Sequence, residues 1–115
     1  CLSRGLGDVY KRQHIRKCVA YINKNLNEKL TVNSVAKYCN LSSDYLSRIF
    51  KEEMGVNLSA YITHQKLEMS QTLLFEGYDS DNICYLLGFS SQSHYISLFK
   101  KEYGITPGEF VALTR

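Results

Sequence analysis

The chain has 115 residues, of which 44% are hydrophobic and 22% charged, with seven glycines and a single proline. This length suits one small domain, the apolar fraction allows a core, and the scarcity of turn residues favours helices. No apolar run approaches the roughly 18 residues that a membrane-spanning helix needs. The formal net charge is +3, and residues 1–13 carry +2 of it, so inferences about charged partners must rest on where the charges lie.

The first thirteen residues, CLSRGLGDVYKRQ, show no helical apolar pattern, no cap and no initiator methionine. The stretch resembles translated adapter sequence from shotgun sequencing reads, particularly in its GDVYKRQ end, and it is too polar for a signal peptide. We expect residues 1–13 to be a non-native or disordered leader outside the fold. We also expect the natural protein to continue upstream.

The four cysteines are Cys1, Cys18, Cys39 and Cys84. None forms a C-x-x-C pair, and no Cys/His spacing matches a zinc site, so we expect no bound metal. Cys18, Cys39 and Cys84 fall at core-facing helical positions, where cysteine behaves as a small hydrophobe. Buried, reduced thiols are expected, as in a cytosolic protein.

Apolar spacing and capping residues predict three helices in the first half of the chain. The first starts near His14 and turns inward Ile15, Cys18, Val19, Ile22 and Leu26. After a turn at residues 27–29, Thr31 caps a short helix whose inner side carries Val32, Val35, Ala36 and Cys39. Ser42 or Ser43 caps the third helix, which turns inward Leu46, Ile49 and Phe50. Gly55 ends that helix in a left-handed conformation.

The second half predicts four more helices. A long one over residues 57–76 carries the stripe Leu58, Tyr61, Ile62, Met69 and Leu73, and Gly77 stops it. Asp79 caps a helix with Ile83, Cys84 and Leu87 inside, and a Gly88–Phe89 turn follows. Ser90 or Ser91 caps a helix that buries Tyr95, Leu98, Phe99 and Tyr103 and ends at Gly104. Thr106-Pro107-Gly108-Glu109 forms a capping box before a last helix with Phe110, Val111 and Leu113. We predict an all-α fold with seven helices and no strand.

The chain contains an internal repeat. A shift of 48 pairs Thr31 with Asp79, and a shift of 49, after one inserted residue, pairs Phe50 with Phe99 and Gly55 with Gly104. Each copy is a short helix, a small-residue turn and a longer helix, the layout of a helix-turn-helix.

The outer face of the second helix in each copy opens with small polar residues and ends with cations. In the first copy it consists of Ser43, Asp44, Ser47, Arg48 and Lys51, and in the second of Ser91, Gln92, Ser93, His94, Ser97, Lys100 and Lys101. Small polar and amide side chains suit base edges, and arginine can bind guanine with two hydrogen bonds. We predict that these residues bind DNA. Two alternatives stay open: Asp44 can serve the helix dipole, and Arg48 can hold a phosphate or pair with Glu52.

LTVNSVAKYCNLSSDYLSRIFKEEMGVNLSAYI and ICYLLGFSSQSHYISLFKKEYGITPGEF resemble the two helix-turn-helix units of the AraC/XylS transcription regulators. The second segment has that family's Gly-Phe turn, an aromatic residue, F-K-K and G-x-T-P. The resemblance covers residues 14–113. It implies a homeodomain-like first unit (14–56), a linker helix (57–77) and a second unit (78–115), which place two recognition helices in successive major-groove segments. The family usually has Arg at Lys66, Ala at Ser70, an apolar residue at Ser80 and Arg near Ser97.

An enzyme and a helical protein-interaction module without DNA binding are the two rival functions. The three histidines (His14, His64 and His94) form no pattern with a nucleophile and a carboxylate, so we expect no catalytic residue and no cofactor. An interaction module would explain the amphipathic helices but not the duplicated polar faces. The resemblance implies double-stranded DNA and RNA polymerase as partners, an effector and dimerisation domain upstream, and the cytoplasm of a bacterium.

Overall fold

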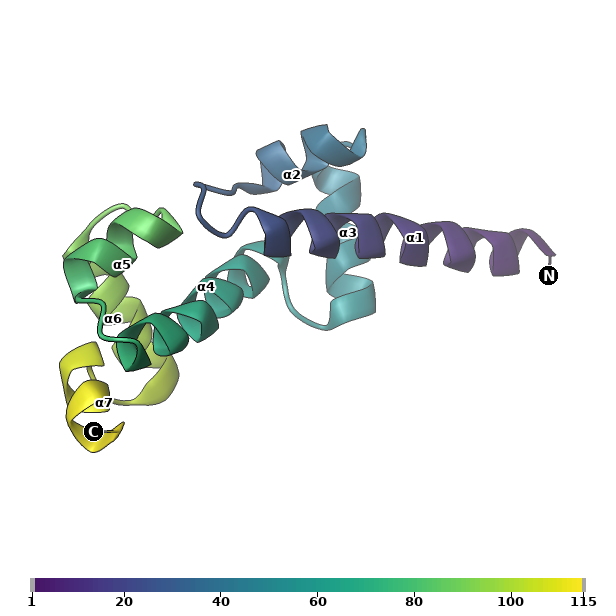
Figure 1. Ribbon diagram of the computed structural model, residues 1–115. Helices are drawn as coiled ribbons and strands as arrows, with labels where there is room; N and C mark the ends of the chain where they lie inside the picture. The colour runs from purple at the N-terminus through teal and green to yellow at the C-terminus, as the bar shows by residue number, and fades with distance from the viewer. Residues whose placement is uncertain (1, 115) are drawn as a thin grey trace. The chain divides into compact units, whose positions relative to one another are not determined.

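The computed structural model describes the backbone of residues 2–114 and the side chains of residues 7–114. It contains seven α-helices and, within this described part, no strand. They are α1 (Leu2–Lys24), α2 (Val32–Cys39), α3 (Ser43–Met54), α4 (Leu58–Phe75), α5 (Ser80–Leu87), α6 (Gln92–Tyr103) and α7 (Pro107–Thr114). The predicted all-α architecture is confirmed (Figure 1).

The helices group into two compact units. The first unit comprises Cys1–Asn25 and Leu30–Thr63, and the second comprises Leu26–Lys29 and His64–Arg115. Helices α1, α2 and α3 pack together in the first unit, and α5, α6 and α7 in the second (Figure 1). Helix α4 contributes its first turns to the first unit and the rest to the second. The three-part division into residues 14–56, 57–77 and 78–115 stays a prediction.

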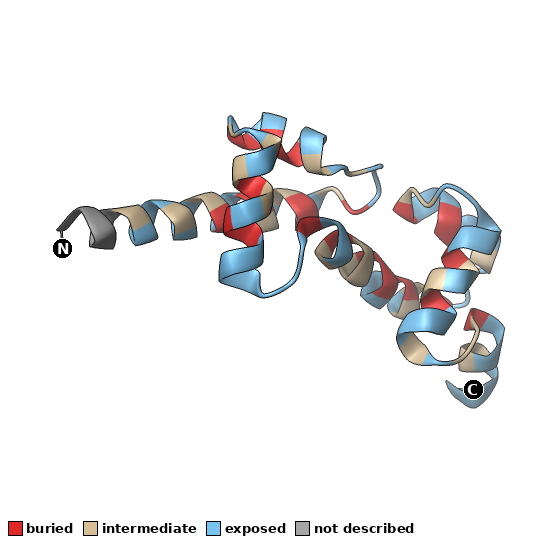
Figure 2. Ribbon diagram, turned by 180° about the vertical axis from the view of Figure 1, so that it is seen from behind, coloured by how far each residue is buried: buried red, intermediate tan, exposed pale blue. Residues whose placement is uncertain are grey.

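The core of the first unit is mostly aliphatic. Figure 2 shows the buried stripes of its helices, and the buried side chains of α1 to α3 are Ile15, Cys18, Ile22, Val35, Ala36, Cys39, Leu46, Ile49 and Phe50. All of these were predicted to face inward. Each large apolar side chain removed from water stabilises the fold by roughly 1.5–3 kcal/mol.

The core of the second unit combines aliphatic side chains with an aromatic cluster. Tyr95 and Phe99 of α6 are fully buried, and the ring of Phe99 packs edge-on against Tyr95 and Phe110 at 5.9 and 5.7 Å. Phe89 contributes a further ring 5.1 Å from Tyr95. Such aromatic pairs add about 0.5–1.5 kcal/mol each beyond the area they bury. Two hydroxyl groups in this core, those of Tyr95 and Tyr103, have no hydrogen-bond partner among the described residues.

The buried stripe of α4 differs from the predicted one. Met69, predicted to face inward, is 43% exposed, and Tyr61 and Leu73 are half-buried. The buried residues are Leu58, Ile62, Lys66, Leu67, Ser70 and Leu74. Most of them recur every fourth residue, as one face of a helix requires. Leu58 and Ile62 are buried as predicted. The prediction failed at Met69 because Lys66 and Ser70 place polar side chains on the buried face, so the apolar residues alone put that face on the side of Met69.

Lys66 is buried because it holds the loop between α1 and α2. Its Nζ donates to the carbonyl oxygen of Glu28 at 2.7 Å and lies 5.7 Å from the centre of the Phe89 ring. Burial lowers the pKa of Lys66. Gly88, the C-cap residue of α5, approaches the same loop: a Cβ there would be 3.0 Å from the backbone carbon and oxygen of Glu28. Both contacts lie within the second unit.

Helix α1 starts at Leu2, whereas the apolar pattern predicts a start near His14. Residues 7–14 of this helix bury no side chain completely, and Val9 and Tyr10 are exposed. An apolar-face argument cannot detect such a segment, because helix propagation adds one hydrogen bond per residue without needing a buried stripe. We expected a non-native or disordered leader, whereas this segment is helical. Its dispensability stays a prediction.

The ends of the helices follow the predicted capping chemistry. The N-cap side chains of Thr31, Ser42, Asp79 and Ser91 each accept a hydrogen bond from a backbone N–H in the first helical turn. Thr106 and Glu109 form the predicted capping box through two hydrogen bonds of 3.1 Å. The bond from the Thr106 backbone N–H to the Glu109 carboxylate lowers the pKa of Glu109. Within α7, Phe110 and Val111 are half-buried and Leu113 is 75% exposed.

Candidate nucleic-acid interface

The outer face of α3 is formed as the sequence predicts. Asp44, Arg48 and Lys51 are exposed, while Ser43 and Ser47 are half-buried at its edge. This arrangement follows from the buried positions Leu46, Ile49 and Phe50, which fix the opposite side of the helix. Ser42 accepts from the backbone N–H of Tyr45 at 3.1 Å and thereby starts the helix just before the polar face begins.

The outer face of α6 is formed in the same way. Every predicted residue of this face is exposed: Ser91, Gln92, Ser93, His94, Ser97, Lys100 and Lys101. Ser91 is also the N-cap, and its hydroxyl oxygen accepts from the backbone N–H of His94 at 3.0 Å. That hydroxyl consequently has a structural role in addition to any contact with a ligand.

Arg48 lies over an aromatic ring. Its guanidinium carbon is 5.4 Å from the centre of the Tyr45 ring, one helical turn earlier. Glu52, the alternative ion-pair partner, instead lies 3.3 Å from Lys11 of α1. An arginine stacked on a tyrosine loses less side-chain freedom when it binds a planar partner. The Arg48–Glu52 pair is absent from the described side chains, and the two DNA-binding roles of Arg48 stay open.

Two further residues of the α3 face have partners within the first unit. The hydroxyl of Ser43 donates to Oδ1 of Asn33 on α2, which joins the starts of the two helices of the motif. The Nζ of Lys51 lies 3.3 Å from the carbonyl oxygen of Gly55 and donates to it, at the end of α3. Lys51 is exposed, so that this bond can be exchanged for a phosphate without unfolding the helix.

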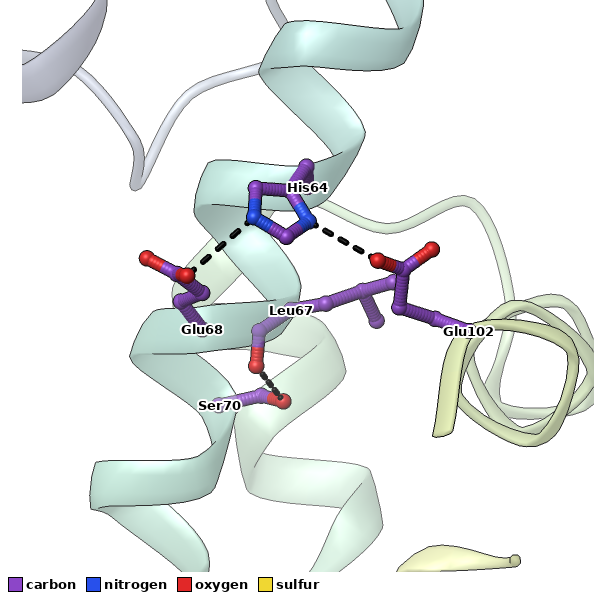
Figure 3. A network of polar contacts seen from close by, with 5 residues as sticks. All are labelled: His64, Leu67, Glu68, Ser70 and Glu102. Carbon is purple, nitrogen blue, oxygen red and sulfur yellow. Dashed lines mark hydrogen bonds and ion pairs between the residues drawn. The ribbon is translucent and has the colours of Figure 1, made fainter. Parts of the chain in front are cut away.

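A histidine links α6 to α4 within the second unit. Figure 3 shows His64 between two carboxylates: its Nε2 lies 3.1 Å from Glu68 and its Nδ1 lies 3.0 Å from Glu102. A neutral imidazole donates from one nitrogen only, so both contacts are hydrogen bonds only when His64 is protonated. Below it, the hydroxyl of Ser70 donates to the carbonyl oxygen of Leu67 at 2.6 Å.

Three residues that support the two faces were not singled out in the sequence. Tyr45 stacks on Arg48, Asn33 accepts from Ser43, and Glu102 holds His64. The spacing of three residues between Tyr45 and Arg48 is the one signal that could have been used, because such residues are neighbours on a helix surface. The other two contacts join residues far apart in the sequence.

Comparison with known proteins identifies this architecture. A family model for a helix-turn-helix domain matches residues 35–112. The fold matches an AraC-type transcriptional regulator from Chromobacterium violaceum with a TM-score of 0.80 and 28% identity, over 90% of this chain and 94% of that one. The chain belongs to the AraC/XylS family of helix-turn-helix transcription regulators.

Other members of the AraC/XylS family agree. The C-terminal domain of AraT, a response regulator from Geobacillus stearothermophilus, has a TM-score of 0.84 and 31% identity, over 89% of this chain and 85% of that one. The bifunctional transcriptional activator and DNA repair enzyme AdaA of Bacillus subtilis is 32% identical over 96 residues, which are 83% of this chain and 46% of AdaA. The melibiose operon regulatory protein of Escherichia coli is 28% identical over 89% of this chain and 34% of that protein.

The chain therefore spans less than half the length of these curated relatives. Its matched part is the AraC-type helix-turn-helix DNA-binding domain. None of the helices in residues 2–114 is long and apolar enough to cross a lipid bilayer. Among the described residues there is no group of three histidine, cysteine, aspartate or glutamate side chains placed to hold a metal ion.

Proposed function

We propose that this domain binds a specific DNA site through the outer faces of α3 and α6, each inserted into a segment of the major groove. The observation that supports this most directly is that the α6 face and the charged residues of the α3 face are exposed. Both faces begin at a serine N-cap and carry no acidic residue except Asp44. A related fold, the DNA-binding domain of AdpA, has been solved in complex with a target DNA. One chain supplies both recognition helices, so the site should be asymmetric.

Within this proposal the cations anchor and the smaller groups discriminate. Lys51, Lys100 and Lys101 lie late in their helices, where a long side chain reaches the phosphate backbone. Phosphate contacts position a protein on the duplex, whereas contacts with base edges carry the sequence information. Arg48 and the first-turn residues of α6 are then the candidates for direct readout.

Selection of a high-affinity duplex from a random pool, followed by footprinting, tests this function. We expect protection over two major-groove segments about one helical turn, roughly 34 Å, apart. Binding should weaken with salt, and Lys100→Ala should lower the salt slope by about one unit while all sequences weaken alike. Lys37→Ala on α2 is a control for the loss of an exposed cation away from the two faces. Binding that needs an inverted repeat, or protection of a single half-turn, would contradict the proposal.

We further propose two partners for the whole protein: RNA polymerase, and an upstream domain that senses an effector and forms dimers. The relatives are two or more times longer than the matched segment, which leaves room for such a domain. In the second unit, Phe75 at the end of α4 and Tyr85 on α5 are 71% and 86% exposed and lie outside the α6 face. Replacing both with serine should lower activated transcription in vitro and leave DNA affinity unchanged.

A non-enzymatic role in the bacterial cytoplasm completes the proposal. The family match covers a regulatory DNA-binding domain, and the relative with a repair activity, AdaA, is more than twice as long as the part that matches. A protein-interaction module is the second candidate, and the exposed Phe75 and Tyr85 favour it. The absence of salt-dependent binding to random duplex DNA would support that module instead.

A further inference from the structure

Two buried thiols face each other in the core of the first unit. Cys18 of α1 is fully buried and Cys39 of α2 is 5% exposed, and their sulfur atoms lie 2.7 Å apart. Both cysteines are free. The sulfur atoms need to move less than about 1 Å to reach bonding distance.

A second set of contacts holds α1 and α2 in register beside these thiols. The ring of Tyr38, next to Cys39 in the chain, stacks on the ring of Tyr21 with centres 4.1 Å apart. The Nζ of Lys17, next to Cys18, lies 5.3 Å from the centre of the Tyr38 ring. The approach of the two sulfur atoms is thus a feature of how the helices pack, not of two freely rotating side chains.

We propose that Cys18 and Cys39 form an oxidisable dithiol, which a hydroperoxide converts to a disulfide that ties α1 to α2. The thiolate of one cysteine attacks an oxygen of hydrogen peroxide, the O–O bond breaks, and a sulfenic acid and hydroxide result; the hydroxide takes up the proton that the thiol released on ionisation and becomes water. The second thiol attacks the sulfenic sulfur, and its proton leaves with the hydroxyl group as another water. Two thiols lose two protons and two electrons, and one peroxide becomes two waters.

The bond would form directly behind the recognition helix of the first unit. Cys39 ends α2, and the turn that follows leads to Ser42, the N-cap of α3. The new link closes a loop between residues 21 positions apart in the sequence, which stabilises the folded unit by restricting the unfolded chain. The outer face of α3 lies on the opposite side of that helix from the core, so the link leaves it in place.

The rate of oxidation depends on access of the oxidant and on the fraction of thiolate. Burial, together with the neighbouring Cys39 thiol, raises the pKa of Cys18. Little thiolate is present at neutral pH, and oxidation should be slow and should accelerate as the pH rises. Cys84 provides an internal comparison: it is also buried, but it lies in the second unit, where its sulfur donates to the carbonyl oxygen of Ser91 at 3.6 Å.

The test uses the full chain with Cys1→Ser, so that the terminal thiol cannot compete. After treatment with hydrogen peroxide and alkylation of the remaining thiols, we expect a peptide linked through Cys18 and Cys39 and an alkylated Cys84. The oxidised protein should melt several degrees higher, and dithiothreitol should reverse the shift. Cys18→Ala and Cys39→Ala should each abolish it, and Cys84→Ala should retain it.

Mapping of the linked peptide requires no variant in the core and no DNA, so it stays informative if the alanine variants do not fold or if the domain does not bind DNA. Oxidation of Cys84 while Cys18 and Cys39 remain alkylated would overturn the proposal. A linked protein that melts no higher would also overturn it. DNA affinity of the linked protein should stay within about five-fold of the reduced form, a change of roughly 1 kcal/mol, and a larger loss would contradict the placement of the link behind α3.

Discussion

The two helix-turn-helix units share their caps and differ in what lies inside and outside them. Both recognition helices start at a serine and end at a glycine with φ near +80°, Gly55 and Gly104. The first unit has a mostly aliphatic core and presents Arg48 on its outer face. The second adds an aromatic cluster around Tyr95 and Phe99 to its aliphatic core and presents Ser97 at the equivalent place. The two repeats thus share the backbone conformation at their helix ends and differ in the side chains of their cores and outer faces.

The buried polar groups of the helices are concentrated in the second unit. Lys66, Ser70 and the unpartnered hydroxyls of Tyr95 and Tyr103 all belong to it. A buried polar group without a partner costs about 1–3 kcal/mol. We infer that the second unit is the less stable of the two and that its recognition helix anchors more than it discriminates. The following predictions, from the largest expected effect to the smallest, test this difference.

The largest effect is expected at the turn of the second unit. Gly88 has φ +69°, and an added Cβ would lie 3.0 Å from the Glu28 backbone. Gly88→Ala should lower the free energy of unfolding by about 2–4 kcal/mol, because left-handed strain and displacement of backbone add together. Urea unfolding followed by circular dichroism measures this.

Matched positions separate the two causes. Gly104 has φ +80° with open space around it, so Gly104→Ala should cost only about 1–2 kcal/mol. In the first unit the equivalent of Gly88 is Asn40, with φ 57° and an exposed side chain, and Asn40→Gly should change stability by less than about 0.5 kcal/mol. Equal costs for Gly88→Ala and Gly104→Ala would show that the Glu28 contact does not matter.

Direct readout should differ between the two half-sites. Arg48→Ala should remove about 1–3 kcal/mol of base discrimination in one half-site, whereas Ser97→Arg should add discrimination in the other, since Ser97 is too short to span to a guanine. A base-by-base affinity scan of the best site with the three proteins measures both. Equal discrimination in both halves by the unaltered protein would reject the unequal division of work.

Local chemistry explains what the sequence could predict. Caps, glycine stops and inward-facing positions of α2, α3, α5 and α6 depend on residues within one or two helical turns. The outer faces of α3 and α6 were predicted by the same periodicity, and their residues are exposed except for Ser43 and Ser47, which are half-buried. Which of their residues touch DNA stays a prediction, because exposure does not distinguish a base contact from a solvated side chain.

The failures were non-local. Lys66 lies on the buried face of α4 because a carbonyl oxygen 38 residues earlier in the chain accepts a hydrogen bond from its Nζ. No sequence pattern around Lys66 reveals that partner. Residues 7–14 of α1 are helical although none of their side chains is buried. The stacking of Arg48 on Tyr45 was in reach of the sequence, because it depends only on a spacing of three residues.

Removal of an unpartnered hydroxyl should stabilise the second unit. Tyr103→Phe should raise the free energy of unfolding by about 1 kcal/mol at neutral pH, because the buried hydroxyl has no partner. Tyr85→Phe is the control, since Tyr85 is 86% exposed and the change should have no effect. Thermal and urea unfolding of the two variants measure the difference.

The advantage of Tyr103→Phe should grow at high pH. Burial, and secondarily the carboxylates of Glu68 and Glu102, raises the pKa of Tyr103 to about 12. An unfolded tyrosine ionises near pH 10, so between about pH 10 and pH 12 the unfolded state loses its proton first and the unaltered protein loses stability. Phenylalanine has no such loss. An advantage that stays constant across this range would exclude the raised pKa.

The smallest effect is expected at the start of α1. A chain that begins at His14 loses the exposed ion pair between Lys11 and Glu52, whose side chains are 30% and 46% exposed. Exposed pairs of this kind contribute about 0–1 kcal/mol, and the core of the first unit starts only at Ile15. The shortened chain should therefore melt within a degree or two of the full one and bind DNA equally well. Lys11→Ala in the full chain isolates the ion pair, and should account for whatever difference remains. A loss of several degrees on truncation that Lys11→Ala does not reproduce would show that the first turns of α1 stabilise the first unit through packing. The shortened chain would then have a smaller difference in stability between the two units than the full chain.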